Sequence, residues 1–173
     1  MGRKNVFFCG LAAFVLLTLM QCRKQSLNDP IPSIQYSGYS KLSYRNFAQD
    51  SVVFVSFTFK DGDGDFGLNL TDSASPFKIG EAYYYNVFAE YLPGKNGVYS
   101  HLISGNDTID YNDRIQNISP DTRDKNISGT ITLKIDPIIG TVVPDSIKLN
   151  IHIVDRALHR SNTINVGPIP VNF

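Results

Sequence analysis

The sequence predicts an all-β fold, and three observations support this prediction. The chain is rich in the β-branched and aromatic residues that favour strands, including eleven Phe and nine Tyr. Several short runs alternate between apolar and polar residues, which is the period of a half-buried strand. No window of useful length shows the periodicity of an amphipathic helix.

The strand-like runs are separated by Gly, Pro, Asn and Asp residues, which favour turns. The alternation is clearest in 51–59, 127–136 and 146–155, where the apolar side chains fall on one face. Two runs, 98–104 and 108–115, are weaker candidates. The last run contains Pro168 and Pro170, and proline is tolerated mainly in edge strands. In order along the chain, the runs are 34–44, 51–59, 82–92, 98–104, 108–115, 127–136, 146–155 and 162–173.

About seven such strands over residues 34–173 are typical of a Greek-key β-sandwich of immunoglobulin-like type. A small barrel is the alternative, because the pattern of alternation does not separate the two architectures. The length of this region suits a single domain.

Residues 1–21 have the pattern of a secretory signal peptide. Arg3 and Lys4 precede an apolar run from Val6 to Met20, and Cys22 follows. The run is shorter than the roughly 20 residues of a membrane-spanning helix. This arrangement resembles a bacterial lipoprotein signal, in which the cysteine is acylated and becomes the first residue of the mature protein. Ordinary secretion and an uncleaved anchor are the alternatives.

Acylation at Cys22 would hold the protein at a membrane, because each buried methylene contributes about 0.8 kcal/mol and two chains anchor stably. Residues 22–33, with two prolines, then form a short tether before the domain at 34–173. Cleavage leaves fourteen basic and sixteen acidic residues, a net charge of −2. This balance argues against nucleic acid as a partner. No free thiol remains, which excludes disulfides and cysteine-based zinc sites.

An acidic loop follows the run at 51–59. Asp61, Asp63 and Asp65 alternate with two glycines, so three carboxylates fall within five residues. Glycine lets the backbone curl at positive φ, and carboxylates are the hard oxygen ligands that Ca²⁺ prefers. The loop therefore suggests a Ca²⁺ site. The alternative is an ordinary Asp- and Gly-rich turn in which Phe66 plugs the core beneath.

Asp155 ends the run at 146–155. In a seven-strand Greek-key sandwich the second and sixth strands, here 51–59 and 146–155, run in the same direction, so the loops after them emerge at the same end. We therefore expect Asp155 to approach Asp61, Asp63 and Asp65 as a fourth metal ligand. The alternative is that Asp155 caps its own turn while Leu158 packs below it.

Two segments together resemble a group of uncharacterised lipoproteins from Bacteroidetes-type bacteria. One is the strand that runs into the acidic loop, Phe59 to Gly67, and the other is Asp155 to Asn162. The resemblance implies an envelope location and an immunoglobulin-like or cadherin-like domain, and it implies no established activity. Arg23 and Lys24 follow the cysteine, where surface-export signals of this group tend to be acidic. We therefore favour the periplasmic face of the outer membrane over the cell surface.

The sequence contains no pattern that indicates an enzyme. The three histidines are isolated, and no nucleophile elbow, phosphate loop or dinucleotide motif is present. Tyr83, Tyr85 and Tyr91 would share one face of a strand at 82–92 and could stack against a glycan, although such a stripe also suits a core.

The expected function is that of a non-enzymatic, membrane-anchored envelope lipoprotein with a binding or scaffolding role, stabilised by Ca²⁺. Its partners would be the membrane, through the lipid, and an envelope protein or glycan. The alternative is a glycan-binding accessory module of an outer-membrane uptake system.

Overall fold

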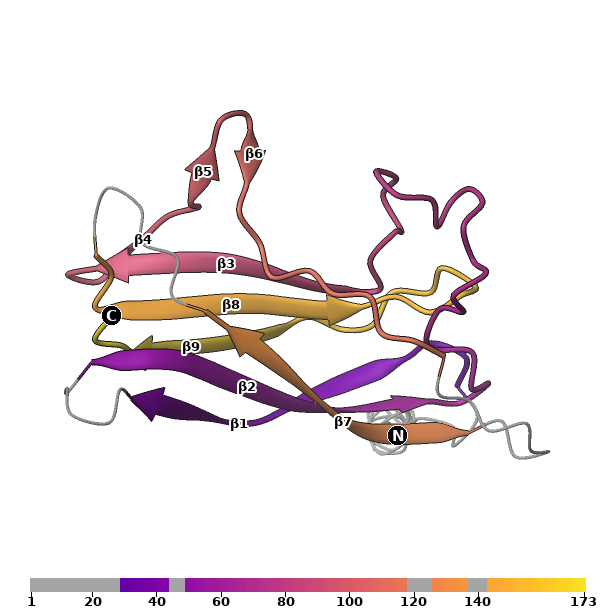
Figure 1. Ribbon diagram of the computed structural model, residues 1–173. Helices are drawn as coiled ribbons and strands as arrows, with labels where there is room; N and C mark the ends of the chain where they lie inside the picture. Colours follow the sequence, from indigo (N-terminus) through magenta and orange to yellow (C-terminus); the bar gives the residue numbers. More distant parts are fainter. Residues whose placement is uncertain (1–28, 44–48, 118–125, 137–142) are drawn as a thin grey trace, which may run out of the picture.

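The computed structural model describes residues 29–43, 49–117, 126–136 and 143–173 (Figure 1). In these ranges the protein is all-β, as the sequence predicted, and no helix long and apolar enough to cross a membrane is found there. The predicted signal peptide, Cys22 and most of the tether at 22–33 lie outside the described residues.

Two antiparallel sheets form the body of the protein. The first has the order β1-β2-β7, with bounds Ser33–Ser43, Asp50–Asp61 and Ile127–Ile135. The second has the order β4-β3-β8-β9, with bounds Val98–Tyr99, Val87–Lys95, Ser146–Ile153 and Ile164–Pro170. A small hairpin, β5 (Ile103–Ser104) and β6 (Asp107–Thr108), projects beyond β3 (Figure 1).

One hydrophobic core lies between the two sheets. In β2 and β8 every second side chain is apolar and buried, because successive residues of a strand point to opposite faces. Burial of these alternate faces removes apolar surface from water and holds the sheets together. The residues concerned are Val53, Val55, Phe57 and Phe59 of β2 and Ile147, Leu149, Ile151 and Ile153 of β8.

The strands with clear alternation lie close to their predicted positions, and β9 is an edge strand as its prolines suggested. The immunoglobulin-like assignment itself stays a prediction. The predicted strand at 82–92 is wrong over its first half. β3 begins only at Val87, because Glu81 to Tyr85 form turns in which the Tyr84 N–H donates to the Glu81 carbonyl at 3.2 Å.

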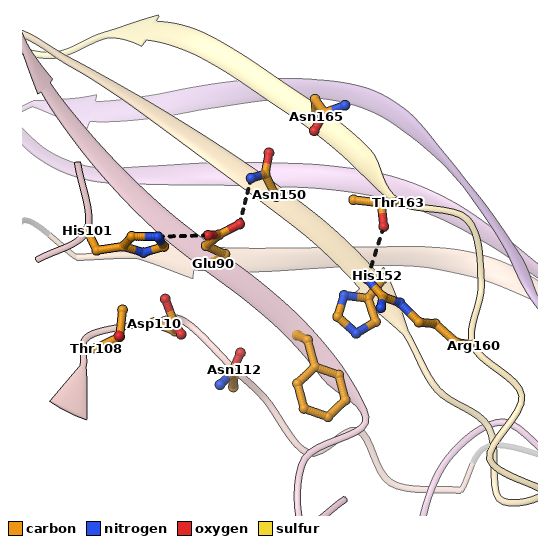
Figure 2. Close-up of a pocket in the computed structure, with 11 residues that line it drawn as sticks. Glu90, His101, Thr108, Asp110, Asn112, Asn150, His152, Arg160, Thr163 and Asn165 are labelled. Carbon is orange, nitrogen blue, oxygen red and sulfur yellow. Dashed lines mark hydrogen bonds and ion pairs between the residues drawn. The ribbon is translucent and has the colours of Figure 1, made fainter. Parts of the chain in front are cut away.

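The weaker run at 98–104 contains only the two-residue strands β4 and β5, and the run at 108–115 contributes only Thr108 to β6, so the prediction of longer strands there is wrong. Residues 109–113 instead run along the free edge of β3. The Tyr111 N–H donates to the Ala89 carbonyl at 2.9 Å. Here side-chain oxygens take the place of the backbone carbonyls of a neighbouring strand (Figure 2). Asp110 Oδ1 accepts from the Tyr91 N–H at 3.1 Å, and Asn112 Oδ1 accepts from the Ala89 N–H at 3.0 Å. This pairing satisfies buried donors and covers the edge of the sheet.

Candidate metal centre

The loop after β2 is closed by the side chain of the residue that precedes it. Asp61 is the last residue of β2 and is only 2% exposed. Its Oδ2 accepts a hydrogen bond from the Phe66 N–H at 2.8 Å. Phe66 is fully buried, and its ring lies 5.0 Å from that of Phe59. Gly64 has a φ of 71°, which lets the backbone turn between the acidic residues. The loop is therefore fastened to the core on one side of the acidic residues.

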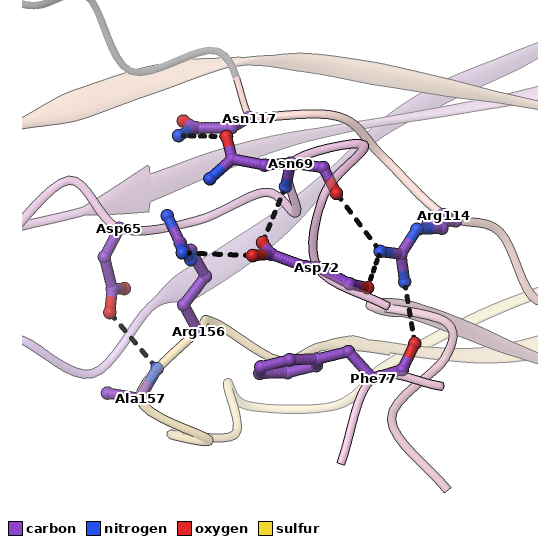
Figure 3. A network of polar contacts seen from close by, with 8 residues as sticks. All are labelled: Asp65, Asn69, Asp72, Phe77, Arg114, Asn117, Arg156 and Ala157. Carbon is purple, nitrogen blue, oxygen red and sulfur yellow. Dashed lines mark hydrogen bonds and ion pairs between the residues drawn. The ribbon is translucent and has the colours of Figure 1, made fainter. Parts of the chain in front are cut away.

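The loop after β8 presents the fourth carboxylate. Asp155 follows β8, and its side chain is completely buried. Its Oδ1 accepts from the His159 N–H at 2.7 Å, and its Oδ2 lies 2.9 Å from His159 Nδ1. The Ala157 N–H donates to Asp65 Oδ2 at 3.1 Å, which joins the two loops directly (Figure 3).

Four carboxylates meet between these loops. One oxygen from each of Asp61, Asp63, Asp65 and Asp155 lies within 4.8 Å of the others. The Oδ1 atoms of Asp61, Asp63 and Asp65 are buried and have no hydrogen-bond partner among the described residues. The structure therefore brings together all four residues that the sequence singled out as metal ligands. Buried polar atoms normally have partners, so the cluster is a place where a metal ion could bind.

The pKa values of Asp61, Asp65 and Asp155 are also shifted in the direction that a bound cation would offset. Burial, with smaller contributions from the charges of Asp63 and Asp65, raises the pKa of Asp61 to about 7. Burial and the charges of Asp155 and Asp63 raise the pKa of Asp65 to about 6. Burial also raises the pKa of Asp155, although His159 opposes this shift. Without a cation the ionised cluster is thus disfavoured, and a bound cation would reverse that balance.

The donor set defines which cations the centre can hold. All four side chains offer carboxylate oxygens, which suit hard divalent cations, whereas structural zinc sites use mainly thiolate and imidazole ligands. His159 points its Nδ1 at Asp155 and thus supports a ligand residue.

The two alternatives for these loops are each right in part. Phe66 does plug the core beneath the acidic turn, and Asp155 does accept a backbone hydrogen bond within its own turn. Leu158, however, is 39% exposed and has a φ of 68°, so the prediction that it packs below the turn is wrong. In Asp61 and Asp65 one carboxylate oxygen accepts a backbone hydrogen bond and the other has no partner among the described residues, whereas both oxygens of Asp155 contact His159.

A polar network holds the neighbouring loop in place (Figure 3). The Arg114 guanidinium donates to the Tyr84 and Asp72 carbonyls at 2.6 and 2.8 Å. Arg156, next to Asp155, lies 3.4 Å from the Asp72 carboxylate, which also accepts from the Asn69 N–H at 2.7 Å. No pattern in the sequence predicts this network, because single Arg, Asn and Asp residues in loops carry no periodic signal.

The predicted glycan-stacking stripe does not exist. Tyr91 is fully buried in the core, where its ring makes an edge contact with Tyr111 at 5.1 Å. Tyr83 and Tyr85 lie in the turns before β3 and share no strand face with Tyr91. The reason is the strand alternation, which places Tyr91 on the same inward face as Val87 and Ala89. The assignment of Tyr91 to glycan binding is therefore wrong.

The comparisons with known proteins give no further identification. No family model, no curated protein and no solved structure matches this chain.

Proposed function

We propose that this protein is a non-enzymatic, membrane-anchored envelope lipoprotein with a binding or scaffolding role, in which Ca²⁺ braces one end of the domain. The observation that supports the metal part is the convergence of four aspartates with three buried, unpartnered oxygens. The lysine- and arginine-flanked apolar segment before Cys22 supports the anchor.

Ca²⁺ suits the centre better than Mg²⁺. Ca²⁺ accepts six to eight oxygen ligands in flexible geometry, whereas Mg²⁺ needs a near-ideal octahedron and retains several waters. Asp61, Asp63 and Asp65 come from one short loop and Asp155 from another, an irregular set that favours the more tolerant ion. Asp61 ends a strand of one sheet and Asp155 follows a strand of the other, so a shared ion would tie the two sheets together.

Thermal unfolding of the full-length chain in detergent tests the metal part. A ligand that binds only the native state stabilises it by about 2.7 kcal/mol at a hundredfold excess over its Kd. We expect a higher Tm in Ca²⁺ than in chelator, and a smaller rise in Mg²⁺. Asp61→Asn should lose the Ca²⁺ response, since it replaces a ligand but can still accept from the Phe66 N–H.

The matched control is Asp107→Asn, which neutralises an exposed aspartate of β6 and should retain the full Ca²⁺ response. An unchanged Tm at millimolar Ca²⁺, or an equal response in wild type and Asp61→Asn, would reject the metal centre.

A further inference from the structure

A polar groove lies on the outer face of the second sheet (Figure 2). Its floor consists of cross-strand pairs of β3 and β8. Phe88 and His152 are stacked, with ring centroids 4.9 Å apart. In the next pair the Asn150 amide donates to Glu90 Oε2 at 2.6 Å. Asn165 of β9 is the register partner of Asn150 and extends the floor by one strand.

Two walls enclose this floor. One wall is the segment that covers the edge of β3, which contributes Asp110 and Asn112. The other includes Arg160, whose guanidinium donates to Thr163 Oγ1 at 3.3 Å. The groove has a volume of about 420 Å³, which falls in the range of small-molecule sites.

The lining offers both donors and acceptors of hydrogen bonds. The Asn side chains each carry one carbonyl and one NH₂ group. One side-chain oxygen of Asp110 and one of Asn112 accept hydrogen bonds from the β3 backbone. The second carboxylate oxygen of Asp110 and the NH₂ group of Asn112 are left for a ligand. Burial, with a smaller contribution from the charge of Arg160, lowers the pKa of His152 to about 4. The imidazole is therefore neutral at pH 7, with one donor and one acceptor nitrogen.

This chemistry selects one ligand class. A phosphorylated or strongly acidic ligand is disfavoured, because the lining holds two carboxylates, Glu90, whose Oε1 lies 3.2 Å from His101 Nε2, and Asp110, beside the single guanidinium of Arg160. A purely apolar ligand would strip water from many polar groups without replacing their hydrogen bonds. An added peptide strand finds no free edge on β3 beside the groove, since residues 109–113 already pair there. A hydroxyl group both donates and accepts, so a ligand with many hydroxyls matches a lining of amides, carboxylates and neutral imidazole.

We propose that this groove binds a neutral carbohydrate, with amide and carboxylate groups on the sugar hydroxyls and the half-buried Phe88 ring against the C–H groups of the sugar. The proposal gives the binding role a ligand class and does not depend on Ca²⁺, because none of the four clustered aspartates lines the groove.

Isothermal titration calorimetry of the full-length chain in detergent tests this proposal. The probes are maltotriose, lactose, mannotriose and chitotriose, with trigalacturonate as an acidic counterpart. We expect at least one neutral sugar to bind more tightly than the acidic one. Asn165→Ala removes an exposed amide from the floor, and Asn112→Asp removes a donor but keeps the oxygen that accepts from Ala89. Each should weaken binding roughly threefold to tenfold, as expected for one lost hydrogen bond.

Thr130→Ala is the matched control, because Thr130 is an exposed polar residue of β7 on the other sheet. It should leave the affinity unchanged. The proposal is overturned if no neutral sugar binds, if only the acidic sugar binds, or if both groove variants bind as tightly as the wild type. A failed Ca²⁺ experiment would not affect this result.

Discussion

The two oxygens of the Asp61 carboxylate have different roles. Oδ2 accepts from the Phe66 N–H and thereby shapes the turn, whereas Oδ1 is buried without a hydrogen-bond partner among the described residues. An asparagine at this position could supply the first interaction but not the negative charge that a cation needs. Asp61 is therefore the residue at which the fold and the candidate metal centre can be separated experimentally.

The pH dependence of stability should reveal the raised pKa of Asp61. This pKa is about 7 in the folded protein, against an ordinary value of about 3.9 in the unfolded chain. At a pH between these two pKa values the native state binds more protons than the unfolded state. The contribution of Asp61 to the free energy of unfolding therefore falls as the pH rises. In chelator, the stability of Asp61→Asn relative to wild type should therefore increase from about pH 4 to about pH 7 and level off above.

Urea unfolding of both proteins at a series of pH values measures this difference. His152 contributes the opposite slope, because its pKa is lowered to about 4, but it is present in both proteins and its contribution cancels. With saturating Ca²⁺ the wild type should be more stable than Asp61→Asn. A stability difference that stays constant across this pH range would contradict the raised pKa.

The loop after β2 is an element fastened at both ends. Beyond Phe66 the chain makes a parallel bridge between Leu68 and Gln116, in which the Leu68 N–H donates to the Ile115 carbonyl at 3.0 Å. Gly67 makes this contact possible. Its φ is 103°, and a Cβ at this position would lie 2.6 Å from both Asn117 Cα and the Gln116 carbonyl oxygen. The acidic loop is thus held against a segment almost fifty residues later in the sequence.

Gly67→Ala should destabilise the protein more than Gly97→Ala does. Both glycines have positive φ, at 103° and 80°, and a Cβ at such an angle costs roughly 1–2 kcal/mol. Only Gly67 also lies against backbone atoms, whereas a Cβ on Gly97 has nothing within 4 Å. Urea unfolding in chelator measures the two losses, and equal losses would show that the backbone contact at Gly67 is unimportant.

At the scale of the whole molecule, the candidate sites occupy separate parts of the sandwich. The candidate metal centre lies where β2 and β8 end, between loops from both sheets. The groove lies on the outer face of the second sheet alone. The loop from Asp155 to Asn162 is close to both, because it contributes Asp155 to the candidate metal centre and Arg160 to the groove.

The lipid anchor predicted at Cys22 would tie this domain to a membrane. Metabolic labelling of the native protein with an alkyne fatty acid tests it. We expect a label on the wild type that is lost in Cys22→Ser and retained in Cys9→Ser, because Cys9 lies in the segment that the predicted cleavage would remove. Mass spectrometry that finds an unmodified thiol at position 22, or residues 1–21 still attached, would contradict the anchor.

The sequence by itself determined the all-β class and the main strands, because strand alternation is a local property of the chain. It also indicated that the four aspartates lie together. The glycine-spaced carboxylates follow one strand and Asp155 follows another, and the two meet if both strands end at the same edge. The start of β3 was not predictable in this way. The tyrosines before Val87 have high strand propensity, but the hydrogen bonds at 81–84 place them in turns.

Only the tertiary structure decided the groove and the covering of the β3 edge. Asp110 and Asn112 act there as substitutes for a strand backbone, through hydrogen bonds to residues about twenty positions away. These contacts and those of Arg114 correspond to no periodic pattern of residues in the sequence. Long-range pairing of polar side chains depends on how the sheets and loops are brought together in space, and that arrangement exists only once the core has formed.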